Sequence, residues 1–268
     1  MKNADIWALA AFCFTMSVLH LVSVAVALIR CRRLSGSHPS QLAPVSIIRP
    51  LCGLDNHLQS TLESTFTLDH SCYEVILCVA HRADPAVALA QDLIARYPLV
   101  PAKLLVGDTR VSSNPKLNNI VKGWNAAAHD WIVIADSNVL MPPDYVARLL
   151  TAWRADTGLV CSPPIGTAPE GIWAELECSF LNAYQARWQY AADSVAFGFA
   201  QGKTMLWRRD IMEGAGGIRS LGAEVAEDAA ATKLVRQAGL RVRLVDAPFP
   251  QPLGQRRFRD VWDRQVRW

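Results

Sequence analysis

The sequence predicts an α/β fold, with a mostly parallel β-sheet flanked by helices and an N-terminal transmembrane helix. Short apolar runs alternate with helical segments along most of the chain, and the runs are continuous, as in strands buried on both faces. One long stretch near the N-terminus has no charged residue. Apolar residues make up 51% of the 268 residues, which is enough for a substantial core.

The N-terminal stretch Ile6–Ile29 contains no Asp, Glu, Lys or Arg. As a helix it would be about 36 Å long, enough to cross a bilayer. Arg30, Arg32 and Arg33 follow it directly, so the positive-inside rule predicts that the rest of the chain is cytoplasmic. A cleaved signal peptide fits less well, because the apolar core is too long and the charge lies on the wrong side.

This gives three regions: an anchor with its basic flank at residues 1–33, a linker rich in Ser, Pro and His at 34–44, and a catalytic domain at 45–268. The predicted strands are 45–48 (ending at Pro50), 73–80, 103–106 and 131–135. The predicted helices are 58–66, 84–96, 117–128, one opened by Pro142-Pro143, a long stretch within 171–193, and one that follows Glu227-Asp228 and ends at Gly239.

Charge and cysteine content narrow the function classes. A net charge of +3 is too small to indicate a nucleic-acid partner. The arginine clusters near residue 30 and near the C-terminus indicate either solvated faces or contact with anionic lipid or phosphate. Seven cysteines without a C-x-x-C pair indicate a reducing compartment, and Cys78 and Cys161 are expected in the core.

Two predicted strands are followed by an aspartate. Asp84 comes after the strand 73–80 and Asp136 directly follows 131–135. Ligands of open α/β sheets bind at the carboxyl ends of strands, and carboxylates there suit a hard divalent cation shared with phosphates. Asp84 could instead cap the following helix, and Asp228 could likewise be only a cap; the same reading is weaker for Asp136, because the next helix starts several residues later.

Gly202-Lys203-Thr204 resembles the end of a phosphate-binding P-loop. The first glycine of that motif would stand at position 197, which is Phe. An ATPase is therefore excluded. At the C-terminus, Arg264 and Arg267 are three residues apart on one helix face beside Trp268. Their guanidinium groups could form bidentate hydrogen bonds to a diphosphate.

Taken in order, these motifs resemble the family 21 glycosyltransferases, the ceramide glucosyltransferase type, and the related family 2. The matching stretches are IIRPLCGLD (47–55), YEVILCV (73–79), NPKLNN (114–119), IADSN (134–138), AED (226–228) and RQVRW (264–268). The resemblance implies a GT-A fold. It also implies inverting transfer of a hexose, glucose favoured, from a UDP-sugar to the hydroxyl of a membrane lipid, ceramide-like acceptors favoured, with Mg²⁺ or Mn²⁺.

The resemblance assigns roles to the acidic residues. Asp84 would lie near the nucleotide, Asp136 at the metal and diphosphate, and Asp228 would be the general base. Related enzymes often carry Asp-x-Asp at the metal site; here the last residue is Asn138, which offers a carbonyl oxygen but no charge.

The remaining predicted site residues would bind the donor. Lys116 and Asn118 would lie near it, and Arg264, Arg267 and Trp268 would close over the donor and the acceptor entrance. Members of this family continue into further membrane segments after the R-x-x-R-W motif. In this sequence the motif ends at Trp268, the last residue, so those segments are expected to be absent from it.

Two alternatives remain open at this point. One is a hopanoid or other lipid glycosyltransferase with the same core. The other is a non-catalytic or truncated membrane scaffold that only binds a nucleotide sugar. Retention of Asp84, Asp136, Asp228 and R-x-x-R-W together favours an enzyme. The sequence does not predict an oligomeric state.

Overall fold

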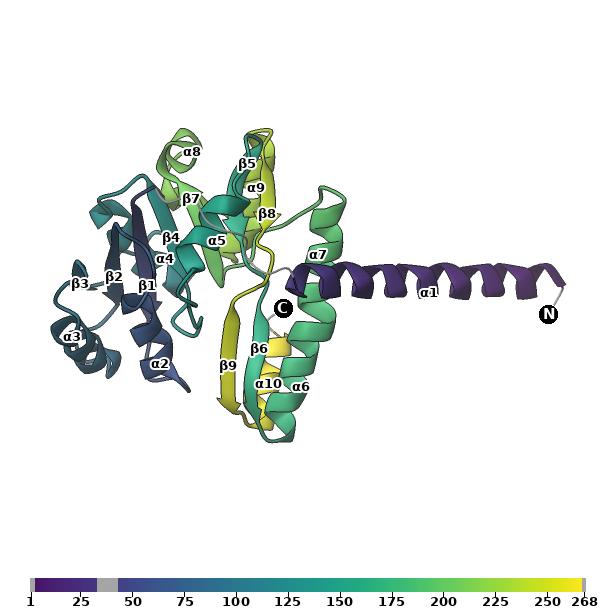
Figure 1. Cartoon of the computed structure of the whole chain (residues 1–268), viewed down its shortest axis with the longest axis horizontal. Helices are drawn as coiled ribbons and strands as arrows, with labels where there is room; N and C mark the ends of the chain where they lie inside the picture. Colours follow the sequence, from purple (N-terminus) through teal and green to yellow (C-terminus); the bar gives the residue numbers. More distant parts are fainter. Residues whose placement is uncertain (1–2, 33–42, 267–268) are drawn as a thin grey trace.

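The main sheet is mostly parallel, as predicted. The computed structural model describes residues 3–32 and 43–266, and within them seven strands form this sheet in the order β3-β2-β1-β4-β7-β5-β8 (Figure 1). Only β7 runs antiparallel to its two neighbours. The strands are β1 (Val45–Leu51), β2 (Tyr73–Val79), β3 (Ala102–Val106), β4 (Trp131–Ala135), β5 (Thr157–Cys161), β7 (Thr204–Arg208) and β8 (Arg241–Leu244).

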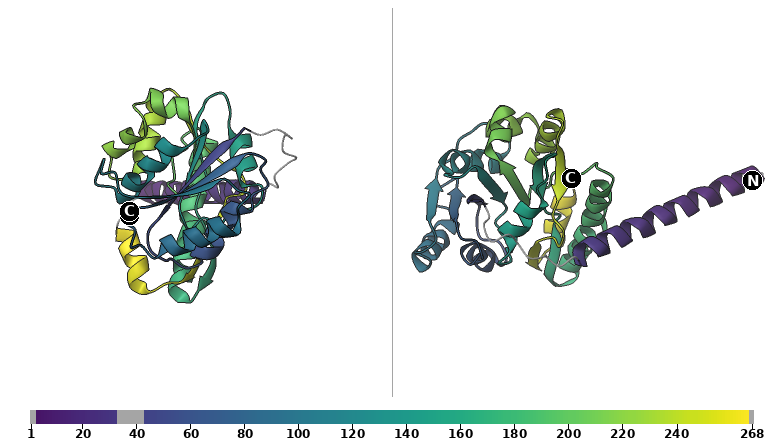
Figure 2. Two further views of the ribbon diagram at one scale, coloured as in Figure 1. Left: turned by 90° about the vertical axis from the view of Figure 1, so that its left-hand side faces the viewer. Right: turned by 45° about the horizontal axis from the view of Figure 1, so that its top comes forward.

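Helices cover both faces of this sheet (Figure 2). One face carries α2 (Leu58–Glu63), α3 (Ala86–Arg96) and α5 (Tyr145–Ala152). The other carries α4 (Pro115–Ala126), α8 (Arg209–Gly214) and α9 (Glu227–Gln237). The continuous apolar runs follow from this arrangement, because neighbouring residues of one strand enter opposite cores.

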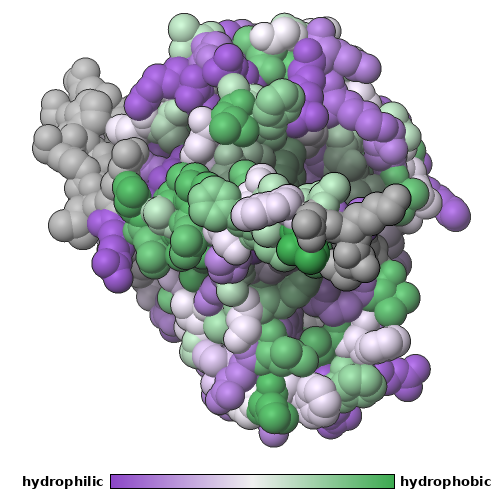
Figure 3. All heavy atoms as spheres, turned by 90° about the vertical axis from the view of Figure 1, so that its right-hand side faces the viewer, coloured by the Kyte–Doolittle hydropathy of each residue, from purple (hydrophilic) through white to green (hydrophobic). Residues whose placement is uncertain are grey.

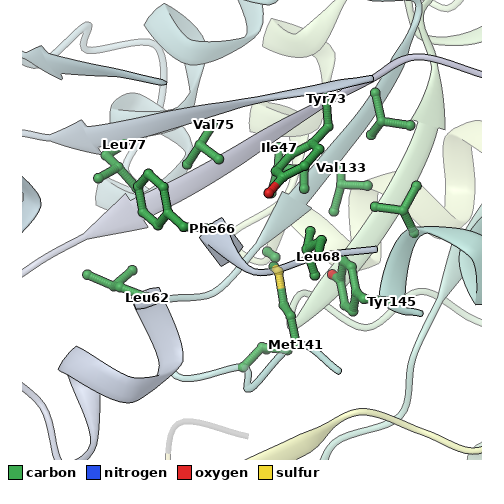
Figure 4. Packing of buried hydrophobic residues seen from close by; sticks show 14 of the residues in the cluster. Ile47, Leu62, Phe66, Leu68, Tyr73, Val75, Leu77, Val133, Met141 and Tyr145 are labelled. Carbon is green, nitrogen blue, oxygen red and sulfur yellow. The ribbon is translucent and has the colours of Figure 1, made fainter. Parts of the chain in front are cut away.

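The first core shows this alternation directly. Ile47, Val75 and Val133 point from three adjacent strands toward Leu62 and the neighbouring 3₁₀ turn of residues 64–66 (Figure 4). Their sequence neighbours on the strands enter the second core on the opposite face. Both Cys78 and Cys161 are fully buried, as expected, and burial raises the pKa of each thiol to about 12.

A smaller unit lies beside the main sheet. Its two parallel strands are β6 (Ile165–Glu170) and β9 (Pro250–Gln255). The predicted helical stretch 171–193 is present as α6 (Ile172–Phe180), a π-helical turn (Leu181–Ala186) and α7 (Arg187–Ser194). The C-terminal helix α10 (Phe258–Val266) packs against α6 (Figure 1).

The N-terminal helix α1 (Asn3–Arg32) projects from the domain and packs on α7 near its C-terminal end (Figures 1 and 2). By length and composition it can cross a membrane, and little of it is buried. Hydrophobic side chains gather around it on the face from which it projects (Figure 3). Most of the predicted linker 34–44 lies outside the described residues.

Arg30 joins α1 to the domain. Its guanidinium bonds to Asp193 at 2.5 Å and Asp246 at 2.6 Å, and it lies over the ring of Tyr190. Sequence reasoning placed this arginine on a solvated face or against lipid. That interpretation is wrong for Arg30, because its guanidinium forms ion pairs with two aspartates more than 160 positions away along the chain.

Several predicted boundaries shift for local reasons. Strand β1 continues through Pro50 to Leu51. Its pairing with β4 has ended at Ile48, so the N–H that Pro50 lacks is not needed for a hydrogen bond to β4. Helix α4 begins at Pro115, because the Asn114 side chain caps it. Pro142 belongs to a turn that precedes α5, not to the helix itself.

A buried arginine shapes the segment that follows β4. Arg49 has no exposed surface, and it donates to Thr65 Oγ1 at 2.8 Å and to the carbonyls of Ser137 and Val139 at 2.9 and 3.0 Å. Burial lowers its pKa to about 10. The guanidinium fork therefore fixes the backbone on both sides of Asn138.

We expect Arg49→Lys to lower the free energy of unfolding by roughly 1–3 kcal/mol, because one ammonium cannot reach all three buried acceptors. Urea unfolding measures the change. The matched variant Arg96→Lys, on the exposed end of α3, should change stability by no more than about 0.5 kcal/mol. Equal stability of both variants would contradict this role of Arg49.

Candidate active site

Asp136 is the centre of a charged cluster at the carboxyl end of β4. The apolar strand Trp131–Ala135 ends there, and both carboxylate oxygens face ammonium groups. Lys116 Nζ lies 2.6 Å from Oδ1, and Lys203 Nζ lies 2.8 Å from Oδ2. The charge at the end of a buried strand is therefore balanced by two lysines.

The first lysine comes from the N-terminus of α4. Asn114 caps this helix by accepting bonds from the amides of Lys116 and Leu117, which places Lys116 in the first turn. Its ammonium also contacts Glu227 Oε1 at 2.6 Å and donates to the carbonyl of Gly202 at 2.7 Å. These three acceptors hold Lys116 in one position.

The second lysine is placed by antiparallel pairing. Strand β7 lies beside β4 with Thr204 opposite Ala135, so Lys203 stands next to Asp136. The backbone amide of Asp136 donates to the Lys203 carbonyl at 3.0 Å. The Lys203 ammonium also donates to Asn138 Oδ1 at 3.3 Å, so it lies between the two oxygens that sequence reasoning assigned to a metal.

Helix α9 brings two further acids in its first turn. Glu227 bonds to Lys116 and to Asn114 Nδ2, and Asp228 Oδ2 accepts from the amide of Gly202 at 3.2 Å. The helix begins after Ala226, and Asp228 lies inside its first turn. The structure therefore does not support the interpretation of Asp228 as only a helix cap.

Gly202 lies where these groups converge. A Cβ at this position would come within 2.9 Å of Glu227 Oε1, 3.1 Å of Lys116 Nζ and 3.5 Å of Asp228 Oδ2. No side chain fits there without displacing the charged groups. The glycine that the sequence presented as part of a P-loop is needed for this close approach instead.

The two aspartates have opposite electrostatic environments. Burial opposes ionisation of Asp136, but Lys116 and Lys203 outweigh it and hold the pKa of this carboxyl well below its usual range. Burial and the adjacent Glu227 raise the pKa of Asp228. Two neighbouring acids with pKa values pushed apart are typical of sites where one holds charge and the other moves a proton.

Asp84 lies at the same rim of the sheet, beyond β1. Its carboxylate accepts from the amide of Gly53, at 3.0 Å to each oxygen, and from the amide of Ala86 at 2.9 Å. It therefore caps α3 and also ties that helix to the loop after β1. With β1 between β2 and β4, Asp84 and Asp136 belong to strand ends about 10 Å apart.

Asn118 does not join the charged cluster. Its Oδ1 accepts from the amides of Val111 and Ser112, and its Nδ2 donates to the Ser112 carbonyl. These bonds shape the loop before α4.

Arg264 also lies apart from the charged cluster. It pairs with buried Glu177 of α6, which Arg256 contacts at 3.3 Å as well. This pairing holds α10 against α6. Arg267 and Trp268 are outside the described residues, so only the start of the R-x-x-R-W motif is placed.

The described residues contain no group of three or more His, Cys, Asp or Glu side chains that could hold a metal by themselves. Asp136 and Asn138 offer two oxygens that already converge on a positive charge, the Lys203 ammonium. This donor set fits a hard cation in place of that ammonium, with further oxygens coming from phosphate and water.

The family model described as glycosyl transferase family 21 matches residues 15–268. The chain belongs to this family. It is 28% identical over 259 residues to ceramide glucosyltransferase 3 of Caenorhabditis elegans, covering 96% of this chain and 56% of that protein. It is 37% identical over 118 residues to the ceramide glucosyltransferase of Komagataella phaffii, covering 42% of this chain and 23% of that protein. The chain thus spans about half the length of the first of these relatives.

Solved structures confirm the predicted GT-A fold of the family 21 chain. The mannosyltransferase PcManGT of Pyrobaculum calidifontis, in complex with GDP-Man and Mn²⁺, matches with a TM-score of 0.64 and 15% identity, covering 100% of this chain and 76% of that one. TarS of S. aureus matches with a TM-score of 0.52 and 14% identity, covering 78% of this chain and 60% of that one.

Sequence reasoning missed three charged residues in the family 21 chain. Glu227 directly precedes Asp228 and was noted only as its neighbour; a second acid in the same helical turn was the available signal. Lys203 was set aside together with the rejected P-loop. Nothing in the sequence indicated that Glu177 is buried, because a glutamate in an amphipathic helix usually lies on the solvent-exposed face.

We expect Asp136→Asn and Asp228→Asn to change stability in opposite directions at neutral pH. Asp136 has a lowered pKa, so its ionised form stabilises the fold above the unfolded pKa of about 3.9, and its loss should cost roughly 3 kcal/mol by leaving two lysines unbalanced. Asp228 has a raised pKa, so its ionised form opposes folding, and Asp228→Asn should raise the melting temperature.

Thermal unfolding of both variants between pH 4 and pH 8 measures these effects. The stabilisation by Asp228→Asn should shrink as the pH falls, because the wild-type carboxyl is then protonated in both states. A stabilising Asp136→Asn or a destabilising Asp228→Asn at pH 7 would contradict the assigned electrostatics.

Proposed function

We propose that this chain carries the catalytic site of an inverting glycosyltransferase. It would transfer a hexose, glucose favoured, from a UDP-sugar to the hydroxyl of a membrane lipid, with a ceramide-like acceptor favoured. The observation that carries the proposal is the pair of unlike acids at one rim of the sheet: Asp136, held ionised by two lysines, and Asp228, held more basic beside it.

The donor diphosphate would lie against the lysines. Lys116 and Lys203 present two ammonium groups at the carboxyl edge, where α/β sheets bind ligands. Asp84, on the far side of β1, would face the nucleoside. Support for glucose as the transferred sugar comes from relatives named ceramide glucosyltransferases, and support for a nucleotide sugar from the mannosyltransferase complexed with GDP-Man.

A divalent cation, Mg²⁺ or Mn²⁺, would be held by Asp136 and Asn138 together with the diphosphate. When bound, it would neutralise the charge that develops on the leaving phosphate oxygens. The mannosyltransferase with the same fold was solved with Mn²⁺, which supports this assignment. With only one carboxylate in the pair, the site should depend strongly on phosphate oxygens for metal affinity.

Asp228 would act as the general base. The bond from the acceptor oxygen to the anomeric carbon forms while the bond from that carbon to the diphosphate oxygen breaks, and the hydroxyl proton passes to the Asp228 carboxylate. One base and a single displacement invert the anomeric configuration. Its raised pKa makes Asp228 a better base, so turnover should fall on the acid side at a higher pH than for an ordinary aspartate.

The proposed acceptor is supported by the exposed apolar helices. Helix α1 is long and apolar enough to span a bilayer, and its flank Arg30-Cys31-Arg32-Arg33 favours a cytoplasmic catalytic domain. Helices α6 and α10 expose further apolar side chains: Ile172, Trp173, Leu176, Phe258, Trp262 and Val266. A lipid could leave the bilayer along such a surface.

The C-terminal motif would close over the donor from this side. Arg264 is held by Glu177 and would orient α10, while Arg267 and Trp268 would contact the donor and the acceptor entrance. Asn118 would act indirectly, by shaping the loop before Lys116.

The proposed reaction can be tested directly with membranes containing the full chain, labelled UDP-hexoses, and ceramide, diacylglycerol or hopanoid acceptors. We expect UDP-glucose and ceramide to give a glycolipid. Asp228→Asn should reduce turnover about 10²–10⁴-fold and leave UDP affinity within a few-fold of wild type. The control Asp210→Asn, at an exposed position of α8, should retain full turnover.

Wild-type turnover by Asp228→Asn would remove this residue from the base role. A product with hopanoid but not ceramide would replace the favoured acceptor, and UDP binding without any product would favour a non-catalytic scaffold.

We also expect Mn²⁺ or Mg²⁺ to tighten UDP binding through Asp136. Calorimetry with and without chelator should show at least a 10-fold difference for wild type and a much smaller one for Asp136→Asn. The same UDP affinity of wild type in metal and in chelator would argue against a cation at this position.

A further inference from the structure

Lys203 occupies the position that a divalent cation would take. Its ammonium lies 2.8 Å from Asp136 Oδ2 and 3.3 Å from Asn138 Oδ1, and the side chain is mostly buried. Once a P-loop is excluded, the resemblance to family 21 gives this lysine no role. The geometry shows a positive charge held by the two oxygens assigned to the metal.

The two lysines of the cluster are bound differently. Lys116 contacts Asp136, Glu227 and the Gly202 carbonyl, which come from three parts of the chain. Among the described residues, the Lys203 ammonium bonds only to the segment after β4. An ammonium has three donors. Lys203 is therefore the more readily displaced of the two.

The charge balance of the cluster disfavours binding of a divalent cation in the absence of the nucleotide sugar. Asp136, Glu227 and Asp228 carry at most three negative charges, and the two lysines carry two positive ones. Each oxygen of Asp136 already contacts an ammonium. A divalent ion bound to this carboxylate would be repelled by both ammonium groups, so it binds more tightly once a lysine leaves, and a diphosphate provides new acceptors for a displaced ammonium.

The surroundings of Lys203 also offer it another acceptor. Lys203 and Gln251 line the same narrow recess, with Thr204 and Phe249. Gln251 is 1% exposed, and neither polar atom of its side-chain amide has a hydrogen-bond partner among the described residues. Its carbonyl oxygen could accept from the ammonium after Lys203 leaves Asp136.

We infer that Lys203 is an internal counter-ion that closes the Asp136–Asn138 position to divalent cations until a nucleotide diphosphate takes up its ammonium. This inference rests on the proposed function. It requires that metal and nucleotide bind together, with little metal bound before the donor. After displacement, Lys203 donates to the diphosphate and adds to the charge that stabilises the leaving group.

The test is Mn²⁺ binding by the full chain in detergent, followed by electron paramagnetic resonance of free Mn²⁺ with and without UDP. Lys203→Met should bind Mn²⁺ alone at least about 10-fold more tightly than wild type, since one charge at this range shifts an ionic equilibrium by one to three decades. UDP should strengthen Mn²⁺ binding strongly in wild type and at least about 10-fold less in Lys203→Met. In chelator, Lys203→Met should bind UDP more weakly.

Two further variants control the measurement. Lys233→Met makes the same charge change at an exposed position of α9, where the lysine pairs with Glu224, and should match wild type. Lys203→Arg keeps the cation and should keep Mn²⁺ binding weak in the absence of UDP. Thermal unfolding checks the fold, and Lys203→Gln replaces Lys203→Met if the latter does not fold.

Equal Mn²⁺ affinity of wild type and Lys203→Met without UDP would overturn the inference. If UDP and Mn²⁺ still bind cooperatively to both proteins, the proposed function survives that result. If neither protein binds UDP with Mn²⁺, the proposed donor site and the inference both fail.

Discussion

The ion pairs around Asp136 hold together the elements that form the site. The carboxylate stands at the end of a buried strand, where an unpaired charge would be costly. Lys116 reaches it from α4 and Lys203 from the segment before β7, while Glu227 of α9 completes the contacts of Lys116. Four segments of the chain therefore meet at one point, two of them more than 60 residues beyond Asp136, and the antiparallel strand β7 is what brings Lys203 beside Asp136.

The same cluster gives two chemically similar acids different properties. Asp136 has two cations in direct contact, whereas Asp228 has an amide donor from Gly202 and the negative charge of Glu227 beside it. A few ångströms of displacement decide which acid holds charge and which can accept a proton. Gly202 permits this close packing, since a Cβ there would crowd the charged ends of Lys116 and Glu227.

A second set of contacts joins α1 and α10 to the rest of the domain. Arg30, at the end of α1, bonds to Asp193 and Asp246, so the projecting helix is joined to the domain through partly buried ion pairs. Glu177 of α6 receives Arg256 and Arg264, which fixes the start of the C-terminal motif. Both sets of contacts restrict how α1 and α10 can move relative to the rest of the domain.

The sequence by itself determined the family, the fold class and the first four strands, whereas β5, β6, β7, β8 and β9 were not predicted. Local patterns predicted the first four parallel strands, the helix 84–96 (α3 in the structure), the apolar helix α1 and the importance of Asp136, because these depend on periodicity and on residues adjacent in the chain. The GT-A fold followed from the order of short motifs. Several predicted boundaries were wrong where a side chain, a missing strand contact or a turn decided them, as at Asn114, Pro50 and Pro142.

Only the tertiary structure decided how charge is distributed. Lys203 pairs with an acid 67 positions away, Arg30 with one 163 positions away, and Glu177 is buried under arginines from the far end of the chain. No local pattern distinguishes such residues from solvated ones. A side chain's charge state depends on burial and on neighbours within a few ångströms, and these are set by strand order and helix packing rather than by sequence spacing.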